Sequence, residues 1–343
     1  MRVAATVALA LLSLLPLSAS TVTLARTPEL VERTVYLMGT RATLVLLATD
    51  RATGVRRLED MVRSLERTEA ELSTWRTDSV LSTVNRQPVG EPFQLPAPIC
   101  VLWGELTAWH RATEGAFDPA VRALAEAWGL RESGRYPSPE ELAAARAVTG
   151  LAHFDFDAST CRVTRVVDAT LDAGAFGKGA ALRRLLLQLE TGAAWMVDLG
   201  GQVAVSGTLP TGPWPVAIAH PARRAQTTFE VALDDGSLAT SGASERSFEV
   251  GGGMVAHLLD PRTGRPLHRP ESVTVWHEDA LVADVLSTAL YVMGLEAGLR
   301  FADEQGFAAV FLTPSNNRDG DAVTPHASQA FRQRFWEAGG TGS

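Results

Sequence analysis

The chain has 343 residues but only one lysine, Lys178, and two cysteines, Cys100 and Cys161. Two cysteines are too few for a disulfide scaffold or a cysteine zinc cluster. They could pair in an oxidising compartment or remain two buried thiols, and their spacing does not decide between these. Positive charge is also scarce, since 31 Lys and Arg face 39 Asp and Glu, a net charge of −8. This argues against a nucleic-acid-binding protein, which needs a basic face for phosphates. With 46% hydrophobic and 20% charged residues, the composition indicates a globular protein.

Only one long apolar run occurs, and it lies at the N-terminus. Met1 and Arg2 precede the apolar stretch 3–17, which Pro16 interrupts and small residues 18–20 follow. This pattern predicts a secretory signal peptide over residues 1–20 and an exported, periplasmic protein. The run is shorter than the roughly 20 residues of a spanning helix. The mature protein is therefore expected not to span a membrane, and the alternative is an uncleaved N-terminal anchor.

The apolar periodicity predicts an α+β fold, with helices clustered early and strands clustered late. Ser138 is the expected N-cap of one helix, and Asp118 with Pro119 the expected start of another. Further elements expected in the first half are a hairpin over 34–48 and helices over 55–72 and 99–109. Those expected in the second half are strands over 161–167, 195–199, 203–206, 216–219, 227–233, 254–259 and 272–276, helices over 179–190 and 281–293, and a helix–strand pair over 296–312.

No Pro/Gly/Ser-rich linker divides the chain into two autonomous parts. We therefore expect a single two-lobed domain over residues 28–313, with mixed or antiparallel sheets and flanking helices. The residues from 314 to 343 are polar and are expected to form a loose C-terminal tail.

The first motif that suggests chemistry is Leu171–Gly179, which connects a predicted strand to a predicted helix. Small residues at 173, 174, 175, 177 and 179 allow a ligand to approach the backbone closely. Free amides at a helix N-terminus attract anions, and the only lysine, Lys178, lies inside this turn. Together these features suggest a phosphate-bearing ligand. The alternative is a tight strand-to-helix connection with a solvent-facing lysine, and the spacing matches neither the P-loop nor the dinucleotide fingerprint.

Two further segments carry side chains that could take part in metal binding or catalysis. Asp284 and Thr288 are four residues apart on a predicted helix and so share one face. Mg²⁺ accepts a carboxylate and a hydroxyl, completed by water, phosphate or carbonyl oxygens. His257 lies at the end of a predicted strand, before an Asp-Pro turn closed by Gly264. The alternatives are a buried polar pair at the helix start and a structural turn with a satisfied histidine.

Eight segments, spanning about residues 34 to 312, together resemble the ApbE family, the FAD:protein FMN transferases. They occur in the order of the family's motifs: Met38–Thr40, Leu72–Trp75, Gly115–Asp118, Asp172–Gly179, Leu199–Gly201, Thr240–Gly242, His257–Gly264 and Ala283–Leu290. The resemblance implies two lobes around a central cleft. It also implies cleavage of the FAD pyrophosphate, transfer of FMN to a Thr or Ser hydroxyl of a target protein, and release of AMP. The family's targets are exported or membrane-bound flavoprotein subunits of electron-transfer complexes.

The resemblance also implies roles for individual residues. Trp75 stands where the family usually has Tyr, which preserves an aromatic ring but loses a hydroxyl. Leu259 replaces the usual Ile at a position that contacts FAD, and Gln202 replaces a residue more often Asn, Asp or Glu. The implied FAD-binding residues are Met38, Trp75, Ala116, Phe117, Asp118, Asp172, Lys178 and Leu259. The implied Mg²⁺ ligands are the Ala175 carbonyl, Asp284 and Thr288, with Ser287 close enough to contribute.

The mechanistic hypothesis adds His257 as general base for the acceptor hydroxyl, because an imidazole titrates near neutral pH. Asp260 is a possible orienting partner for it. Two other functions use the same residues. In an FAD pyrophosphatase, water replaces the acceptor and FMN and AMP are both released. A flavin-binding protein without catalysis would retain FAD unchanged.

Overall fold

The computed structural model describes residues 27–189, 193–242, 247–250, 252–315 and 322–337. The predicted signal peptide over residues 1–20 lies outside these ranges. Across the described ranges, no helix is both long enough and apolar enough to cross a bilayer.

The centre of the described fold is an eight-stranded sheet in which every neighbouring pair is antiparallel. Side chains alternate between its faces, as in the second strand, where Leu44 points to one core and Val45 to another. The strand order is β1 (Glu29–Leu37), β2 (Thr40–Ala48), β6 (Trp195–Leu199), β7 (Gln202–Ser206), β10 (Asp235–Gly242), β15 (Ser272–His277), β16 (Ala308–Pro314) and β17 (Val323–Ala327).

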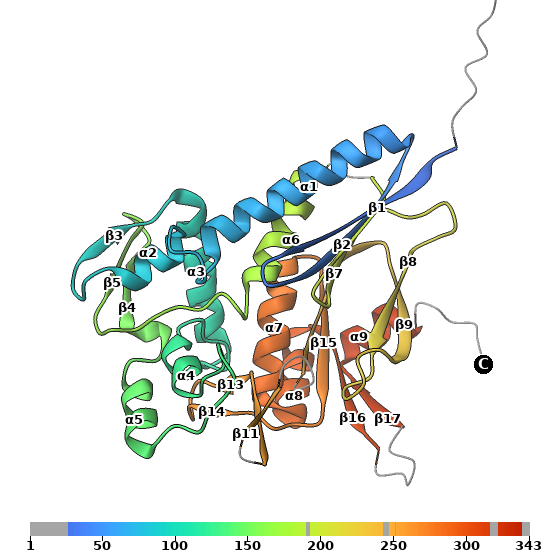
Figure 1. Ribbon diagram of the computed structural model, residues 1–343. Coiled ribbons are helices and arrows are strands. Elements are labelled where there is room, and N and C mark those ends of the chain that lie inside the picture. Colours follow the sequence, from blue (N-terminus) through green and yellow to red (C-terminus); the bar gives the residue numbers. More distant parts are fainter. Residues whose placement is uncertain (1–26, 190–192, 243–246, 251, 316–321, 338–343) are drawn as a thin grey trace, which may run out of the picture.

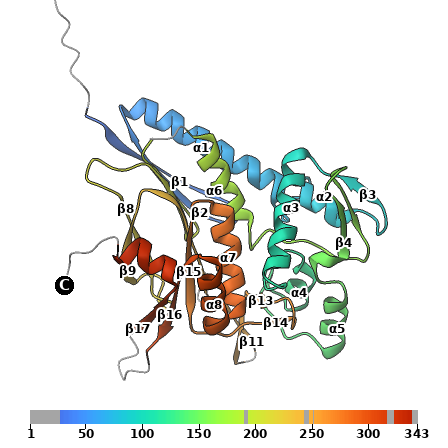
Figure 2. The same cartoon turned by 180° about the vertical axis from the view of Figure 1, so that it is seen from behind.

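Both faces of this sheet are covered (Figures 1 and 2). The helices on one face are α1 (Arg51–Leu72), α6 (Gly177–Gln188), α7 (Ala280–Met293) and α8 (Leu295–Gln305). The hairpin of β8 (Trp214–Ala219) and β9 (Thr227–Leu233) covers the other face together with α9 (Gln329–Phe331). This arrangement confirms the α+β prediction of an antiparallel sheet with flanking helices.

A second group of elements packs beside the sheet, on the left of Figure 1. It contains a small sheet with the strand order β3 (Pro92–Gln94), β5 (Arg162–Arg165) and β4 (Phe154–Asp157). Its helices are α2 (Val80–Arg86), α3 (Ala97–Ala112), α4 (Arg122–Ala127) and α5 (Pro139–Ala147), followed by the short helix η1 (Leu151–His153). The capping box at Ser138 and Glu141 confirms the predicted start of α5.

Helix α7 belongs to both groups. Leu281, Val285 and Ala289 pack into the core of the small group, whereas Val282, Leu286 and Leu290 pack against the large sheet. Because it is enclosed on both sides, nearly every residue of α7 is buried, and any polar side chain on it needs a partner.

Two short antiparallel hairpins connect the sheet to α4 and α5: β11 (Ser247–Val250) with β12 (Gly253–Ala256), and β13 (Leu259–Asp260) with β14 (Arg265–Pro266). Their side chains Val255 and Leu259 share a core with Leu124 and Leu130. The predicted single strand over 254–259 is therefore two strands, separated by His257 and Leu258.

Two further sequence predictions are wrong. Asp118 does not begin a helix, since its carboxylate accepts hydrogen bonds from the Ala120 and Leu151 amides and α4 begins only at Arg122. The segment after Pro314 is not a loose tail throughout, because β17 pairs with β16 and Phe331 is fully buried. The few apolar residues of this segment are enough to hold it in place, because they cover the exposed edge and face of an existing sheet.

The two cysteines form a disulfide, which settles the alternatives left open by the sequence. Cys100 in α3 and Cys161 before β5 have Cα atoms 5.4 Å apart and close a loop with a sequence separation of 61. The bond fixes the small sheet against α3, within the core of the small group.

Replacing both cysteines by serine should destabilise the protein by about 4 kcal/mol, because the unfolded chain regains the entropy of a large loop. Urea unfolding of Cys100→Ser/Cys161→Ser against the oxidised wild type measures this. Equal stability of the two proteins would contradict a disulfide in the native state.

Candidate active site

The structure brings the small-residue turn and the predicted metal helix together. The Gly179 amide, in the first turn of α6, donates a 2.8 Å hydrogen bond to Oδ2 of Asp284 on α7. A Cβ on Gly179 would lie 2.6 Å from both the Ala280 carbonyl oxygen and the Asp284 Cβ. Only glycine therefore permits this approach, and the carboxylate of one helix caps an otherwise unpaired amide of another.

The two segments that meet at this contact carry three types of oxygen donor. Asp284 is 4% exposed, and its backbone carbonyl accepts a 2.9 Å bond from the Ser287 hydroxyl, which also lies 3.0 Å from Ser241 Oγ. Thr288 lies one turn further on the same face, and no hydrogen bond is made by its hydroxyl within the described residues. In the same ranges no hydrogen bond reaches the Ala175 carbonyl, because the Gly179 amide is bonded to Asp284.

These donors fit a small divalent cation. A carboxylate, a hydroxyl and a carbonyl are the hard oxygen ligands that Mg²⁺ prefers, and Mg²⁺ usually retains water or substrate oxygens as further ligands. The described part of the chain contains no cluster of three or more His, Cys, Asp or Glu side chains suited to a metal. A cation at Asp284 would therefore need additional oxygens from a ligand such as a diphosphate.

Lys178 immediately precedes Gly179 and is half-buried. Its ammonium makes no ion pair within the described ranges. The lone lysine thus stands at the positive N-terminal end of α6, beside Asp284, where it is available to an anionic ligand.

Met38 reaches the same region from the turn between β1 and β2. Its backbone has φ +52° and its amide donates a 2.9 Å hydrogen bond to the Glu69 carboxylate. A Cβ on Gly177 would lie 3.6 Å from the Met38 Cε, so the thioether side chain lies against the start of α6. Beside it, Gly200 approaches Thr40 so closely that a Cβ would lie 2.5 Å from the threonine hydroxyl.

Asp172 connects this turn to the small group of helices. Its Oδ1 accepts the Gly174 amide at 2.8 Å, and its Oδ2 accepts the Arg131 guanidinium at 2.7 Å. The same guanidinium lies over the Trp75 indole, 3.7 Å from the ring centroid. Trp75 is 69% exposed, unusual for so large an apolar side chain. Arg131 was missed by sequence reasoning, because no local motif contains it.

The segment Ala116–Asp118 lies next to Asp172, to which the following residue, Pro119, is hydrogen-bonded. Ala116 and Phe117 are fully buried in the core of the small group, so only their backbone can face a ligand. Burial raises the pKa of the Asp118 carboxyl, while His110 Nδ1 at 3.3 Å acts in the opposite direction. The Asp172 amide donates to the Pro119 carbonyl at 2.7 Å, so this segment supports Asp172 directly.

His257 and Leu259 lie on the two connecting hairpins. His257 follows β12 and is half-buried, whereas Leu259 is 8% exposed and packs with Leu124 and Val255. The Asp260 carboxylate accepts hydrogen bonds from the Arg262 amide and guanidinium, each at 2.9 Å. The Asp260 carboxylate therefore stabilises the turn in which it lies. Its proposed effect on the orientation of His257 stays a prediction.

Gln202, for which the sequence offered no explanation, supports α7 from behind. Its amide nitrogen donates to the Ala280 carbonyl at 2.9 Å and to Ser237 Oγ at 3.2 Å. The Ala280 carbonyl oxygen is also one of the two atoms that would lie 2.6 Å from a Cβ on Gly179. Gln202 thus holds the start of α7 in place, one turn before Asp284.

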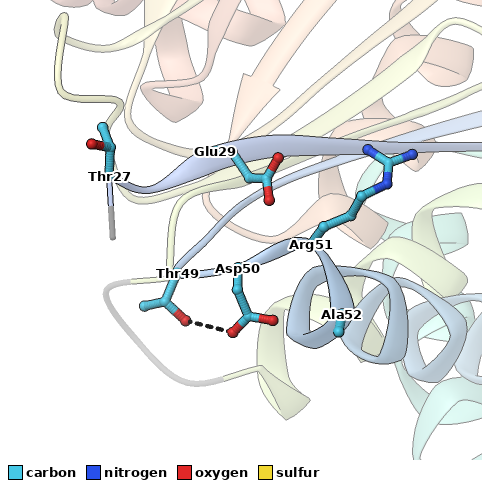
Figure 3. Close-up of a pocket in the computed structure, with 6 residues that line it drawn as sticks. All are labelled: Thr27, Glu29, Thr49, Asp50, Arg51 and Ala52. Carbon is cyan, nitrogen blue, oxygen red and sulfur yellow. Dashed lines mark hydrogen bonds between the residues drawn. The ribbon is translucent and has the colours of Figure 1, made fainter. Parts of the chain in front are cut away.

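Two open hollows on the surface lie away from these residues. Figure 3 shows the first, of about 410 Å³, where Glu29 at the start of β1 faces Asp50 and Arg51 at the start of α1. The second lies at the start of α8, beside Arg269 and Arg300. Neither contains a predicted site residue.

Comparison of the sequence with known proteins identifies the family. A family model described as the ApbE family matches residues 38–311. An FAD:protein FMN transferase of Vibrio cholerae is 32% identical over 79% of this chain and 82% of its own length. A second FAD:protein FMN transferase, from Haemophilus influenzae, is 29% identical over 82% of this chain and 84% of its own length.

Two solved structures extend the comparison to the fold. The ApbE protein of Thermotoga maritima has a TM-score of 0.80 at 28% identity, covering 89% of this chain and 99% of its own. The apo flavinyl transferase ApbE of Pseudomonas stutzeri has a TM-score of 0.76 at 30% identity, covering 92% and 98%. The similar proteins from Vibrio cholerae, Haemophilus influenzae and Pseudomonas stutzeri are flavin-transferring enzymes. The chain belongs to the ApbE family, as its motifs indicated.

The contact between α6 and α7 yields a direct test. Gly179→Ala should destabilise the protein by about 1–3 kcal/mol, since the added methyl group forces the two helices apart. It should also weaken the binding of any ligand that Asp284 and the turn hold jointly. Thermal unfolding measures the first effect.

Gly104→Ala is the matched control, because Gly104 lies inside α3 and its added Cβ would have only one neighbour, Phe156 Cε1 at 3.9 Å. That substitution should stabilise the helix by about 0.5–1 kcal/mol. Equal stability of Gly179→Ala and the wild type would contradict the close helix contact.

Proposed function

We propose that the protein is a Mg²⁺-dependent transferase that moves FMN from FAD to a Thr or Ser hydroxyl of an acceptor protein. The acceptor oxygen bonds to the FMN phosphorus, the bond from that phosphorus to the bridging oxygen breaks, and AMP leaves. The observation that carries the proposal is the contact between Gly179 and Asp284. It sets a buried carboxylate beside the N-terminus of α6, in whose first turn the lone lysine also lies.

Asp284, Thr288 and the Ala175 carbonyl would hold the cation. A bound Mg²⁺ supplies positive charge that stabilises the transferring phosphoryl group and the departing AMP. Lys178, in the first turn of α6, adds to this charge without rearrangement, since it is already in place. The chain has a net charge of −8, so these local positive groups oppose the overall repulsion of an anionic substrate.

The other residues position FAD and the acceptor. Trp75 presents an exposed indole for stacking on a flat ring, and Met38 lies against the start of α6. His257 accepts the proton of the acceptor hydroxyl as the new bond forms, which requires a neutral imidazole. Ala116, Phe117 and Leu259 shape the site through the backbone and the core, since their side chains are buried.

We also propose that the enzyme is exported to the periplasm and acts on a flavoprotein subunit of a membrane electron-transfer complex. The Cys100–Cys161 disulfide supports export, because such bonds persist mainly in oxidising compartments. FMN must be attached where the acceptor lies, so enzyme and acceptor share that compartment.

One assay separates transfer from hydrolysis. The protein is incubated with FAD, Mg²⁺ and a purified acceptor subunit, and AMP, free FMN and SDS-stable flavin fluorescence on the acceptor are measured. Transfer predicts AMP together with protein-bound flavin. AMP with free FMN alone would indicate a pyrophosphatase, and bound FAD without AMP would indicate a flavin-binding protein.

A further inference from the structure

Arg131 contacts three residues of the candidate site, Thr74, Trp75 and Asp172, although it lies in none of the sequence motifs. It follows α4 in a turn, and its side chain is only 14% exposed. One guanidinium nitrogen donates to Asp172 Oδ2 at 2.7 Å and to the Thr74 hydroxyl at 3.2 Å. The other donates to the Thr74 carbonyl at 3.3 Å, and the flat face covers Trp75.

Keeping a guanidinium in this position is costly. Burial lowers the pKa of Arg131, the charge of Asp172 opposes this shift, and the charge of Arg122 acts in the same direction as burial. Arg122 also donates to the Thr74 carbonyl, at 3.2 Å, so two cations converge on one backbone oxygen. The Thr74 carbonyl has two lone pairs and accepts both guanidinium groups, and Arg122 alone would already pair this oxygen.

The geometry of Trp75 shows what the second cation adds. The indole is 69% exposed although the guanidinium covers one of its faces, so the remaining surface is open to solvent. A guanidinium stacked on an indole restricts its rotation and adds cation–π attraction. The same guanidinium fixes the carboxylate of Asp172, whose other oxygen holds the Gly174 amide of the small-residue turn.

We propose that Arg131 is a positioning residue for FAD, which locks Trp75 and Asp172 into one arrangement before the dinucleotide binds. This rests on the proposed function, since Trp75 and Asp172 are taken there as FAD-binding residues. Arg131 touches neither phosphate nor acceptor in this role. It joins the stacking ring, in the turn after α1, to the turn that precedes α6.

The test compares Arg131→Ala and Arg131→Lys with the wild type, using FAD as the probe in equilibrium dialysis with Mg²⁺ present. Arg131→Ala should weaken FAD binding about tenfold, because stacking and a charged hydrogen bond are both lost. Arg131→Lys should recover part of this loss, since an ammonium can bond to Asp172 but lacks the planar face. At saturating FAD, kcat should change by less than about twofold, since Arg131 holds no reacting atom.

Arg135→Ala is the control, because Arg135 lies in the same turn and its exposed side chain pairs with Glu141. It should leave FAD affinity unchanged. A double-mutant cycle adds the readout that a structural role would not move. In a Trp75→Ala background, Arg131→Ala should weaken FAD binding by a smaller factor than in the wild type.

The outcomes separate the two proposals. Wild-type affinity in Arg131→Ala, or a loss that falls on kcat while FAD affinity holds, would overturn the positioning role and leave the transferase proposal intact. Full additivity with Trp75→Ala would also overturn it. A wild-type protein that neither binds FAD nor releases AMP would remove the proposed function, and the inference with it.

Discussion

Asp284→Asn should slow FMN transfer by about 10³-fold, because electrostatic stabilisation of the transferring phosphoryl is usually the dominant catalytic contribution. Asparagine is chosen because its carbonyl oxygen can still accept the Gly179 amide, so the α6–α7 contact survives while the negative charge is lost. The rate is measured as AMP release and as flavin bound to the acceptor.

Metal binding provides the second readout for this variant. Calorimetric titration with Mg²⁺ in the presence of FAD should give binding to the wild type and none to Asp284→Asn. Asp155→Asn is the matched control, since Asp155 is an exposed residue of β4 and should leave both measurements unchanged. Wild-type Mg²⁺ binding and rate in Asp284→Asn would contradict the assignment of the cation site.

His257→Ala should lower the transfer rate by about 10²–10⁴-fold while FAD affinity stays close to that of the wild type. The imidazole acts only on the proton of the acceptor hydroxyl, so it contributes to the chemical step and not to the binding of FAD. The measurements are kcat with the acceptor subunit and the dissociation constant of FAD.

The pH dependence sharpens this prediction. Protonated imidazole cannot accept a proton, so the wild-type rate should fall on acidification as the imidazole becomes protonated, and this decrease should vanish in His257→Ala. His268→Ala, at an exposed position, should behave as the wild type. An unchanged rate in His257→Ala would show that another group takes the proton.

The sequence predicted much of the site because the decisive contacts are made by short motifs. The small-residue turn ending at Gly179 was recognisable from its composition, and Asp284 and Thr288 from their helical spacing. Their proximity followed from the family resemblance, and the structure supplies its physical reason: a Cβ at Gly179 would collide with α7. The roles assigned to individual residues stay predictions.

What the sequence could not predict depends on distant contacts. Arg131 is ordinary in its local context, and only folding places it between Asp172 and Trp75. Strand β10 was missed because its small and polar residues are buried on both faces, without the alternation of a half-exposed strand. Helix α2 was missed because three of its seven residues are buried, too few for a clear period.

The most direct test of the central claim is a crystal structure of the protein with FAD and Mg²⁺. We expect the diphosphate to lie between the turn over residues 172–179 and Asp284, with the ion bonded to the Asp284 carboxylate and to phosphate oxygens. A diphosphate bound elsewhere, with no ion at Asp284, would contradict it.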